Sequence, residues 1–233
     1  MSEPDEAPTQ RIVVETNGPY RVEGNVRILR TAIVKTDRGE PVAWDEGPDF
    51  RRRKTALLCR CGRSSNKPFC DSTHETWAFD GTETGDRGPM LERAEAWQGE
   101  EGVVLYDDGS LCTHAGFCKT VSRGVWDMIA DPVAAVREEG RAMIRRCPSG
   151  RLAYVVEPDP RPVEPEFEPS IGVEPNASLW VRGNIPVVSE DGTPYQVRNR
   201  KTLCRCGHSR NKPFCDGSHA VHRFRDRAMP AKS

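Results

Sequence analysis

Two stretches of seventeen residues decide how this chain folds, because each gathers three cysteines and one histidine at the same spacing. Residues 58–74 read LCRCGRSSNKPFCDSTH, and residues 203–219 read LCRCGHSRNKPFCDGSH. Thirteen of the seventeen positions are identical, which indicates two copies of one structural module. The duplication extends more weakly upstream, where residues 20–26 (YRVEGNV) match residues 179–185 (LWVRGNI), and we expect an insert in the first copy within residues 36–50.

The cysteines fall into three groups of three with none left over: Cys59, Cys61, Cys70; Cys112, Cys118, Cys147; and Cys204, Cys206, Cys215. An odd total of 9 cannot be fully paired in disulfides. The N-terminal residues MSEPDEAPTQ are acidic and polar, without the apolar stretch of a secretory signal. We therefore expect a cytoplasmic protein, in which clustered cysteines bind metal more often than they form crosslinks.

The bulk composition excludes several classes of protein. Only 36% of the 233 residues are hydrophobic and 7% are aromatic, while there are 20 glycines and 19 prolines, so several small modules are expected rather than one large core. A net charge of −1 offers no general basis for binding nucleic acid. No apolar run approaches the 18 or more residues that a membrane helix needs.

Each repeat provides a metal-ligand pattern of Cys-x-Cys, eight residues, and Cys-x3-His. Two cysteines separated by one residue can bind the same iron, and a cysteine and a histidine four apart leave the same face of a helical turn. Asp71 and Asp216 follow the third cysteine, where an acidic side chain can cap a short helix. Zinc also accepts three cysteines and one histidine, although its common sites space their ligands more widely. The spacing favours an iron–sulfur cluster and leaves zinc open.

The repeats resemble the CDGSH family of iron–sulfur proteins, also called NEET proteins. Residues 215–219 spell CDGSH in full, and residues 70–74 read CDSTH, with Ser72 and Thr73 in place of glycine and serine. The resemblance implies one [2Fe–2S] cluster in each module. Cys59 and Cys61 would bind the inner iron of the first cluster, and Cys70 and His74 the outer one. In the second module the same roles would fall to Cys204 with Cys206, and to Cys215 with His219.

An imidazole ligand has two chemical consequences for such a cluster. It carries no negative charge, so it raises the reduction potential relative to an all-cysteine site. It must be neutral to bind iron, so acid can remove it. We therefore predict clusters that decay as the pH falls. Equal rates of absorbance loss in the native protein and a His219→Cys variant would contradict this prediction.

The middle cysteines form a different pattern, Cys112-Thr-His114-Ala115-Gly-Phe-Cys118 followed by Cys147-Pro148. This segment resembles a divergent single-cluster ferredoxin whose second cysteine is replaced by Ala115. The resemblance implies either a [4Fe–4S] cluster with His114 as fourth ligand or a [3Fe–4S] cluster on three cysteines; a lost or zinc-filled site is the remaining alternative. His114 could equally contact only a sulfide or the backbone. A [3Fe–4S] EPR signal in the oxidised protein would exclude the four-iron form for the isolated state.

We expect a strand-rich α+β fold with two β-rich modules, paired within the chain as a pseudo-dimer, and a small α+β ferredoxin-like module. The expected divisions are a mobile tail (1–15), the first module (16–95), the ferredoxin-like module (96–157), a proline-rich acidic linker (158–175) and the second module (176–228). Within the middle module, residues 103–106 and 152–156 read as strands. Val133, Val136, Met143 and Ile144 have helical spacing toward Cys147.

The expected function is electron transfer or iron–sulfur cluster transfer to a redox partner or cluster-acceptor protein. No catalytic motif is present, so we expect no enzyme activity. Two alternatives remain: a structural zinc protein that binds a partner, and an electron-transfer subunit of a separate oxidoreductase. Because single-module family members pair as homodimers, a chain with two modules is expected to be a monomer, its modules held together by their high effective concentration.

Overall fold

The computed structural model describes residues 10–226, and two of its β-sheets contain strands from both copies of the repeat. The first sheet has the order β11-β1-β2-β5 and the second has the order β12-β10-β9-β3-β4. The first copy provides β1 (Arg11–Val14), β2 (Tyr20–Glu23), β3 (Arg27–Lys35), β4 (Pro41–Asp49) and β5 (Thr55–Leu58). The second copy provides β9 (Ser170–Val173), β10 (Leu179–Arg182), β11 (Val187–Ser189) and β12 (Arg200–Leu203).

The two copies exchange strands reciprocally. In chain order, β1, β2, β3 and β5 correspond to β9, β10, β11 and β12. β3 leaves its own copy and pairs in parallel with β9, with Arg27 opposite Ser170. Its counterpart β11 pairs in parallel with β1, with Ile12 opposite Val187. The expected internal pairing of the modules is therefore confirmed, and it places a pseudo-two-fold axis between them.

One hydrophobic core serves both copies. Side chains on the inner faces of the two sheets alternate with more exposed ones, as on β2, where Tyr20 and Val22 are buried. Val14 and Leu58 of the first copy pack in the same cluster as Val181 of the second. Because neither copy has enough apolar residues for a large core of its own, this sharing provides the buried area that a small domain lacks.

The middle module has its own sheet and core. Strands β6 (Glu95–Gln98), β7 (Val103–Asp107) and β8 (Leu152–Val156) form an antiparallel sheet, and the helices α3 (Val125–Met128) and α4 (Ala134–Arg145) pack against it. The predicted strands and the predicted helix leading to Cys147 are thus confirmed. The short helix α2 (Met90–Arg93) precedes the sheet, and the 3₁₀ turn η1 (Gly109–Leu111) leads into Cys112.

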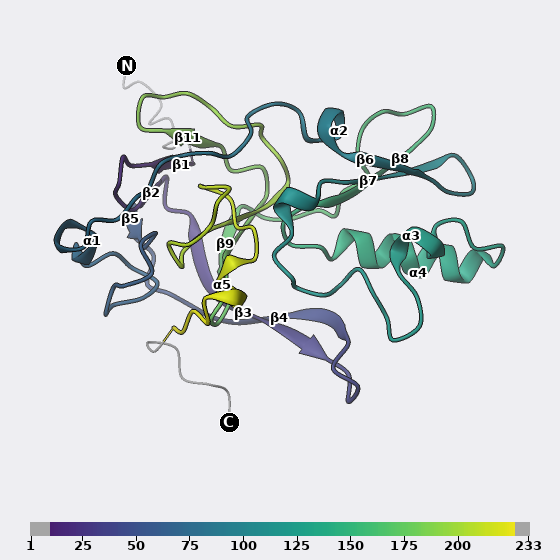
Figure 1. Ribbon diagram of the computed structural model, residues 1–233, viewed down its shortest axis with the longest axis horizontal. Coiled ribbons are helices and arrows are strands. Elements are labelled where there is room, and N and C mark those ends of the chain that lie inside the picture. The colour runs from purple at the N-terminus through teal and green to yellow at the C-terminus, as the bar shows by residue number, and fades with distance from the viewer. Residues whose placement is uncertain (1–9, 227–233) are drawn as a thin grey trace, which may run out of the picture.

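The insert of the first copy adds β4 and lengthens β3, and the resulting hairpin of β3 and β4 extends to the middle module (Figure 1). Near its tip, the Trp44 indole donates a hydrogen bond to the carbonyl of Arg146 at 3.1 Å. Its ring packs on Phe117 of the middle module and on Trp180 of the second copy, with centroid distances of 5.2 and 4.4 Å. The hairpin therefore joins three parts of the chain at one aromatic cluster.

Two expected divisions were placed wrongly. Residues 11–14, within the range expected as a mobile tail, form β1, and Ile12, Val13 and Val14 are buried. Residues 170–173, assigned to the linker, form the fully buried strand β9. Both errors have the same cause: each strand lies between a strand of its own copy and a strand of the other copy, and the local sequence does not reveal the second partner. Residues 1–9 and 227–233 lie outside the described part.

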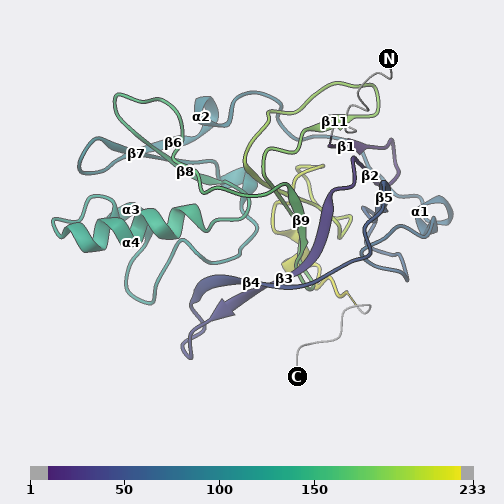
Figure 2. The same ribbon diagram turned by 180° about the vertical axis from the view of Figure 1, so that it is seen from behind.

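The cluster-motif helices occupy different places along the long axis of the molecule. The first motif ends in α1 (Thr73–Thr76) and the second in α5 (Ser218–Val221). α1 lies at one end, the module with α3 and α4 lies at the other, and α5 lies between them (Figure 1, Figure 2). Among the helices of residues 10–226, none has the length and apolar character that a membrane crossing requires.

Candidate metal centres

Cys59, Cys61, Cys70 and His74, called here the first Cys3His site, lie as two close pairs. The sulfurs of Cys59 and Cys61 are 3.7 Å apart, and the sulfur of Cys70 is 3.4 Å from Nδ1 of His74. The predicted helical turn thus brings cysteine and histidine together. The N-cap of this turn is Ser72, which makes no side-chain capping hydrogen bond. Asp71 lies one residue earlier, and its carboxylate accepts hydrogen bonds from the backbone and hydroxyl of Thr73 at 3.2 and 2.7 Å.

The second Cys3His site, Cys204, Cys206, Cys215 and His219, repeats this geometry. The Cys204 and Cys206 sulfurs are 3.7 Å apart, and Cys215 Sγ is 3.4 Å from His219 Nδ1. Two sulfurs at about 2.3 Å from one tetrahedral metal stand about 3.8 Å apart, and a sulfur and a nitrogen about 3.6 Å apart. Each pair thus has the separation for binding one metal, and two pairs fit the two irons of a [2Fe–2S] cluster. No three Cys, His, Asp or Glu side chains of residues 10–226 converge as a single-ion site.

The backbone around the inner cysteines is arranged for a thiolate. The Cys59 sulfur is hydrogen-bonded to the Cys61 side chain and to the backbone amides of Ser64 and Gly62, and these contacts lower the pKa of Cys59. The same interaction raises the pKa of Cys61. The donors around Cys204 are equivalent, because the backbone amides of Ser209 and Gly207 replace those of Ser64 and Gly62. These amides provide partial positive charge where a metal-bound sulfur carries negative charge.

The arginine between the inner cysteines, identical in both copies, was not singled out from the sequence. Arg205 is buried and donates to Asp226 at 2.5 Å and to the carbonyls of Ala177 and Glu174 at 2.9 and 2.6 Å. Arg60 likewise donates to backbone carbonyls, including that of Gly81 at 2.6 Å. These arginines hold the Cys-x-Cys loop against the rest of its module. The presence of an arginine at this position in both motifs was the sequence signal that could have identified these residues.

The Cys-x-Cys loops of the two sites are in contact with each other. A Cβ atom added at Gly62 would lie 2.4 Å from the carbonyl oxygen of Cys206, and one at Gly207 would lie 2.7 Å from that of Cys61. Both distances are far shorter than any normal contact, so only glycine allows this approach. The pseudo-two-fold axis therefore passes between the two sites.

Cys112, Cys118 and Cys147, called here the middle site, line one cavity of about 330 Å³ together with His114. α4 ends just before Cys147, and η1 ends just before Cys112. Nδ1 of His114 is 3.9 Å from the sulfur of Cys112. Cys112 and Cys118 lie in the loop between η1 and α3, and Cys147 lies in the loop after α4. A cavity that these two loops surround with thiols has the donors for an iron–sulfur cluster.

Arg151 provides positive charge beside the middle site. Its guanidinium donates to both carboxylate oxygens of Asp107, at 2.5 and 2.8 Å, and lies near enough to Cys112 for their charges to interact. Hydrogen bonding to Asp107 raises the pKa of Arg151, so the group stays charged. A fixed cation near thiolate ligands stabilises their negative charge.

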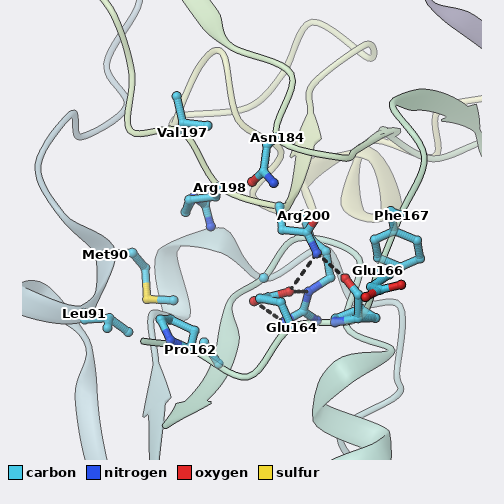
Figure 3. A pocket seen from close by; sticks show the side chains of 14 residues that line it. Met90, Leu91, Pro162, Glu164, Glu166, Phe167, Asn184, Val197, Arg198 and Arg200 are labelled. Atoms are coloured by element: carbon cyan, nitrogen blue, oxygen red, sulfur yellow. Dashed lines mark hydrogen bonds and ion pairs between the residues drawn. The ribbon is translucent and has the colours of Figure 1, made fainter. Parts of the chain in front are cut away.

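Arg200 of β12 ties the second module to the loop of Cys147, and no sequence pattern pointed to it. It is 1% exposed and donates to the carbonyls of Ile144, Arg145 and Cys147 at 2.9, 3.1 and 2.7 Å. Two more bonds reach the Glu164 carboxylate at 2.5 and 2.8 Å (Figure 3). The cation thus satisfies the carbonyls at the negative end of α4. This pair lies beside a cavity of about 490 Å³ at the junction of the modules (Figure 3).

Comparison with known families agrees with this geometry. The family described as iron-binding zinc finger, CDGSH type, matches residues 17–75 and 176–220. The family described as divergent 4Fe-4S mono-cluster matches residues 98–157 between them. Neither a curated protein nor a solved structure matches the chain. The chain is therefore an iron–sulfur protein that contains two CDGSH-type regions on either side of a divergent 4Fe-4S mono-cluster region.

Proposed function

We propose that this protein transfers electrons with three clusters, a [2Fe–2S] cluster in each Cys3His site and a [4Fe–4S] cluster in the middle site. The observation that carries the proposal is the grouping of all 9 cysteines at three sites, each with the donors for one cluster. No thiol is left for catalysis, so we propose no enzymatic role for the chain itself. When bound, the clusters supply one-electron redox chemistry.

The chain's own residues support the clusters in three ways. The inner cysteines and the Cys-His pairs provide the donors. The backbone amides around Cys59 and Cys204 stabilise the charge of the bound sulfur. Arg151 places a positive charge beside Cys112, and Arg200 binds the carbonyl of Cys147. His114 faces Cys112 through Nδ1, which keeps it a candidate fourth ligand.

Iron and sulfide analysis with EPR in both redox states tests this proposal. A four-iron middle cluster predicts about eight irons and eight sulfides per chain, whereas a [3Fe–4S] cluster predicts about seven irons and eight sulfides. A Cys118→Ser variant is expected to lose the middle cluster and keep the two-iron signals. A colourless protein that contains zinc instead of iron would contradict the proposal and favour the structural zinc alternative.

Exposure at the first site favours a second candidate function, the donation of clusters or iron. His74 and Cys70 are partly exposed, whereas Cys215 and His219 are 2% and 9% exposed. A ligand that solvent reaches is the natural point of release. Transfer to an apo-ferredoxin, followed by the change in its absorbance, tests this function.

The partner is expected to be acidic at its docking surface. An open hollow of about 690 Å³ beside the first site is lined by the cations Arg63, Lys67, Arg223 and Arg225. None of the four makes an ion pair within residues 10–226. Opposite charge accelerates the encounter of redox partners. The partner is a free carrier or the catalytic chain of an oxidoreductase, which co-purification would distinguish.

The internal exchange of β3 and β11 supports a monomer, because the pairing that a second chain would provide is made within this one. Size-exclusion chromatography with light scattering tests this. A stable dimer at micromolar concentration would contradict it.

A further inference from the structure

The two Cys3His sites, although built alike, have different surroundings. In the first copy Asp71 and Ser72 are exposed, and Trp77 just beyond them is 49% exposed. In the second copy Gly217 and His219 are buried. The difference arises because the middle module covers the second site and leaves the first one open.

The covering residue is His114 of the middle site. A Cβ atom built at Gly217 would lie 2.2 Å from Cδ2 of His114, 2.7 Å from its Nε2 and 2.9 Å from the carbonyl oxygen of Cys112. One edge of the imidazole thus rests on the motif glycine of the second site. The other edge, with Nδ1, faces Cys112. His114 also lies close enough to His219 for its charge to lower the pKa of that residue, after the larger effect of burial.

The two copies show that contact, and not backbone conformation, requires the glycine. Gly217 has φ +84°, in the left-handed region, but Ser72 takes the equivalent place in the first copy with φ +65°. A serine is therefore compatible with this turn where its side chain meets solvent. At Gly217 the side chain would enter the space of His114.

A second contact joins the same two loops. The Asn211 side chain, within the second motif, donates to the carbonyl of Ser110, two residues before Cys112, at 3.0 Å. On its other side, the second site meets the first through the Gly62–Cys206 and Gly207–Cys61 contacts. The second site is thus in contact with both of the others, in agreement with the position of α5 between α1 and the middle module (Figure 1, Figure 2).

We infer that His114 joins the middle site to the second Cys3His site, so that the three sites form a linear series in the order first, second, middle. This inference rests on the proposed electron-transfer function. An electron supplied by a one-electron reductant at the exposed first site reaches the middle site through the second. In each step the donor site is oxidised by one electron and the neighbouring site is reduced by one, while no atom or proton moves. His114 is a positioning residue for the second step, whether or not it also binds iron.

EPR power saturation of the reduced, fully loaded protein tests the order of the sites. A nearby paramagnetic cluster accelerates the relaxation of its neighbour. Cys118→Ser removes the middle cluster and is expected to slow the relaxation of one two-iron signal only. That signal must be the one that His219→Cys shifts, and His74→Cys must leave it in place. If the first-site signal responds instead, or if both or neither respond, the order is wrong.

Reciprocal exchange of the motif residue tests the role of His114. Gly217→Ser is expected to lower the midpoint of thermal unfolding of the cluster-loaded protein. It should also weaken the magnetic coupling between the second Cys3His site and the middle site in the EPR measurement. The matched variant Ser72→Gly should do neither. His114→Ala should weaken the coupling in protein that iron and sulfide analysis shows to retain the middle cluster, and adding it to Gly217→Ser should restore the midpoint. Loss of the middle cluster from His114→Ala would make His114 a ligand of that cluster, and the Gly217→Ser result would then decide the inference. Full coupling in His114→Ala would overturn the inference.

Iron and sulfide analysis separates this inference from the proposed function. A protein without clusters would refute both. Three loaded clusters with no coupling between the second and middle sites would refute the linear series alone.

Discussion

Replacement of Arg200 by methionine is the sharpest test of how the second module supports the middle site. The buried guanidinium donates to three carbonyls around the end of α4, to that of Leu152 at 3.3 Å, and to Glu164. Methionine keeps much of the apolar stem but removes every one of these donors. The Glu164 carboxylate loses its cation, and buried carbonyls lose their partners.

The expected cost follows from these contacts. Breaking a buried ion pair by removing one partner costs about 3–5 kcal/mol, and the orphaned carbonyls keep the value for Arg200→Met in the upper part of that range. A folded domain has a free energy of unfolding of about 5–15 kcal/mol, so the cost of Arg200→Met is a large fraction of the total stability. With a urea dependence of about 1–3 kcal/mol per molar, the unfolding midpoint should fall by about 1–5 M.

The assay combines urea unfolding, followed by tryptophan fluorescence, with iron content. Because Arg200 holds the carbonyl of Cys147, we expect the middle cluster to be lost while both two-iron EPR signals remain. Arg145→Met is the matched control, since that half-buried guanidinium donates to Tyr154 and Glu138 and should cost less than about 1 kcal/mol. A midpoint for Arg200→Met equal to that of the control, with the middle cluster intact, would refute the reasoning.

Four further predictions follow from exposure, burial and charge. An iron chelator should strip the first site before the second, so that bleaching is biphasic and His74→Cys slows the fast phase while His219→Cys slows the slow one. Burial lowers the pKa of Lys201 to about 7 from 10.5. The free energy of unfolding should therefore decrease as the pH falls from about 10.5 toward 7, because the unfolded chain binds this proton first. Lys201→Met should flatten this dependence of the unfolding free energy on pH, measured by urea titration. Trp44→Ala should destabilise the hairpin contact by about 2 kcal/mol, measured by urea unfolding, without loss of the two-iron signals. An anionic oxidant should react with the first site faster than a cationic one in stopped-flow measurements, and added salt or Arg63→Glu should reduce the difference; equal rates would count against the cationic hollow.

Local sequence patterns were sufficient to predict which cysteine and histidine side chains lie close together. The four-residue spacing of Cys70 and His74 predicts one helical turn, and the 3.4 Å contact between their donor atoms agrees with it. The strands before and after the middle site were also predictable, because the hydrophobic runs at Val103 and Leu152 are local signals. The grouping of cysteines in threes predicted the number of sites.

The strands β1 and β9 were not predictable in the same way, because each owes its order to a partner more than a hundred residues away. The structural role of Arg200 could not be predicted from the sequence for the same reason. Its buried charge is stabilised by carbonyls that lie more than fifty residues away in the chain.

The sequence by itself determined which residues can bind metal, because ligand pairing within a turn depends on spacing along the chain. It also determined that the two Cys3His modules are alike. Only the tertiary structure decided that they differ in exposure, since the middle module packs on one and not the other. Position 72 is a serine because its side chain extends into solvent in the first copy. The equivalent position 217 is a glycine because a side chain there would collide with His114.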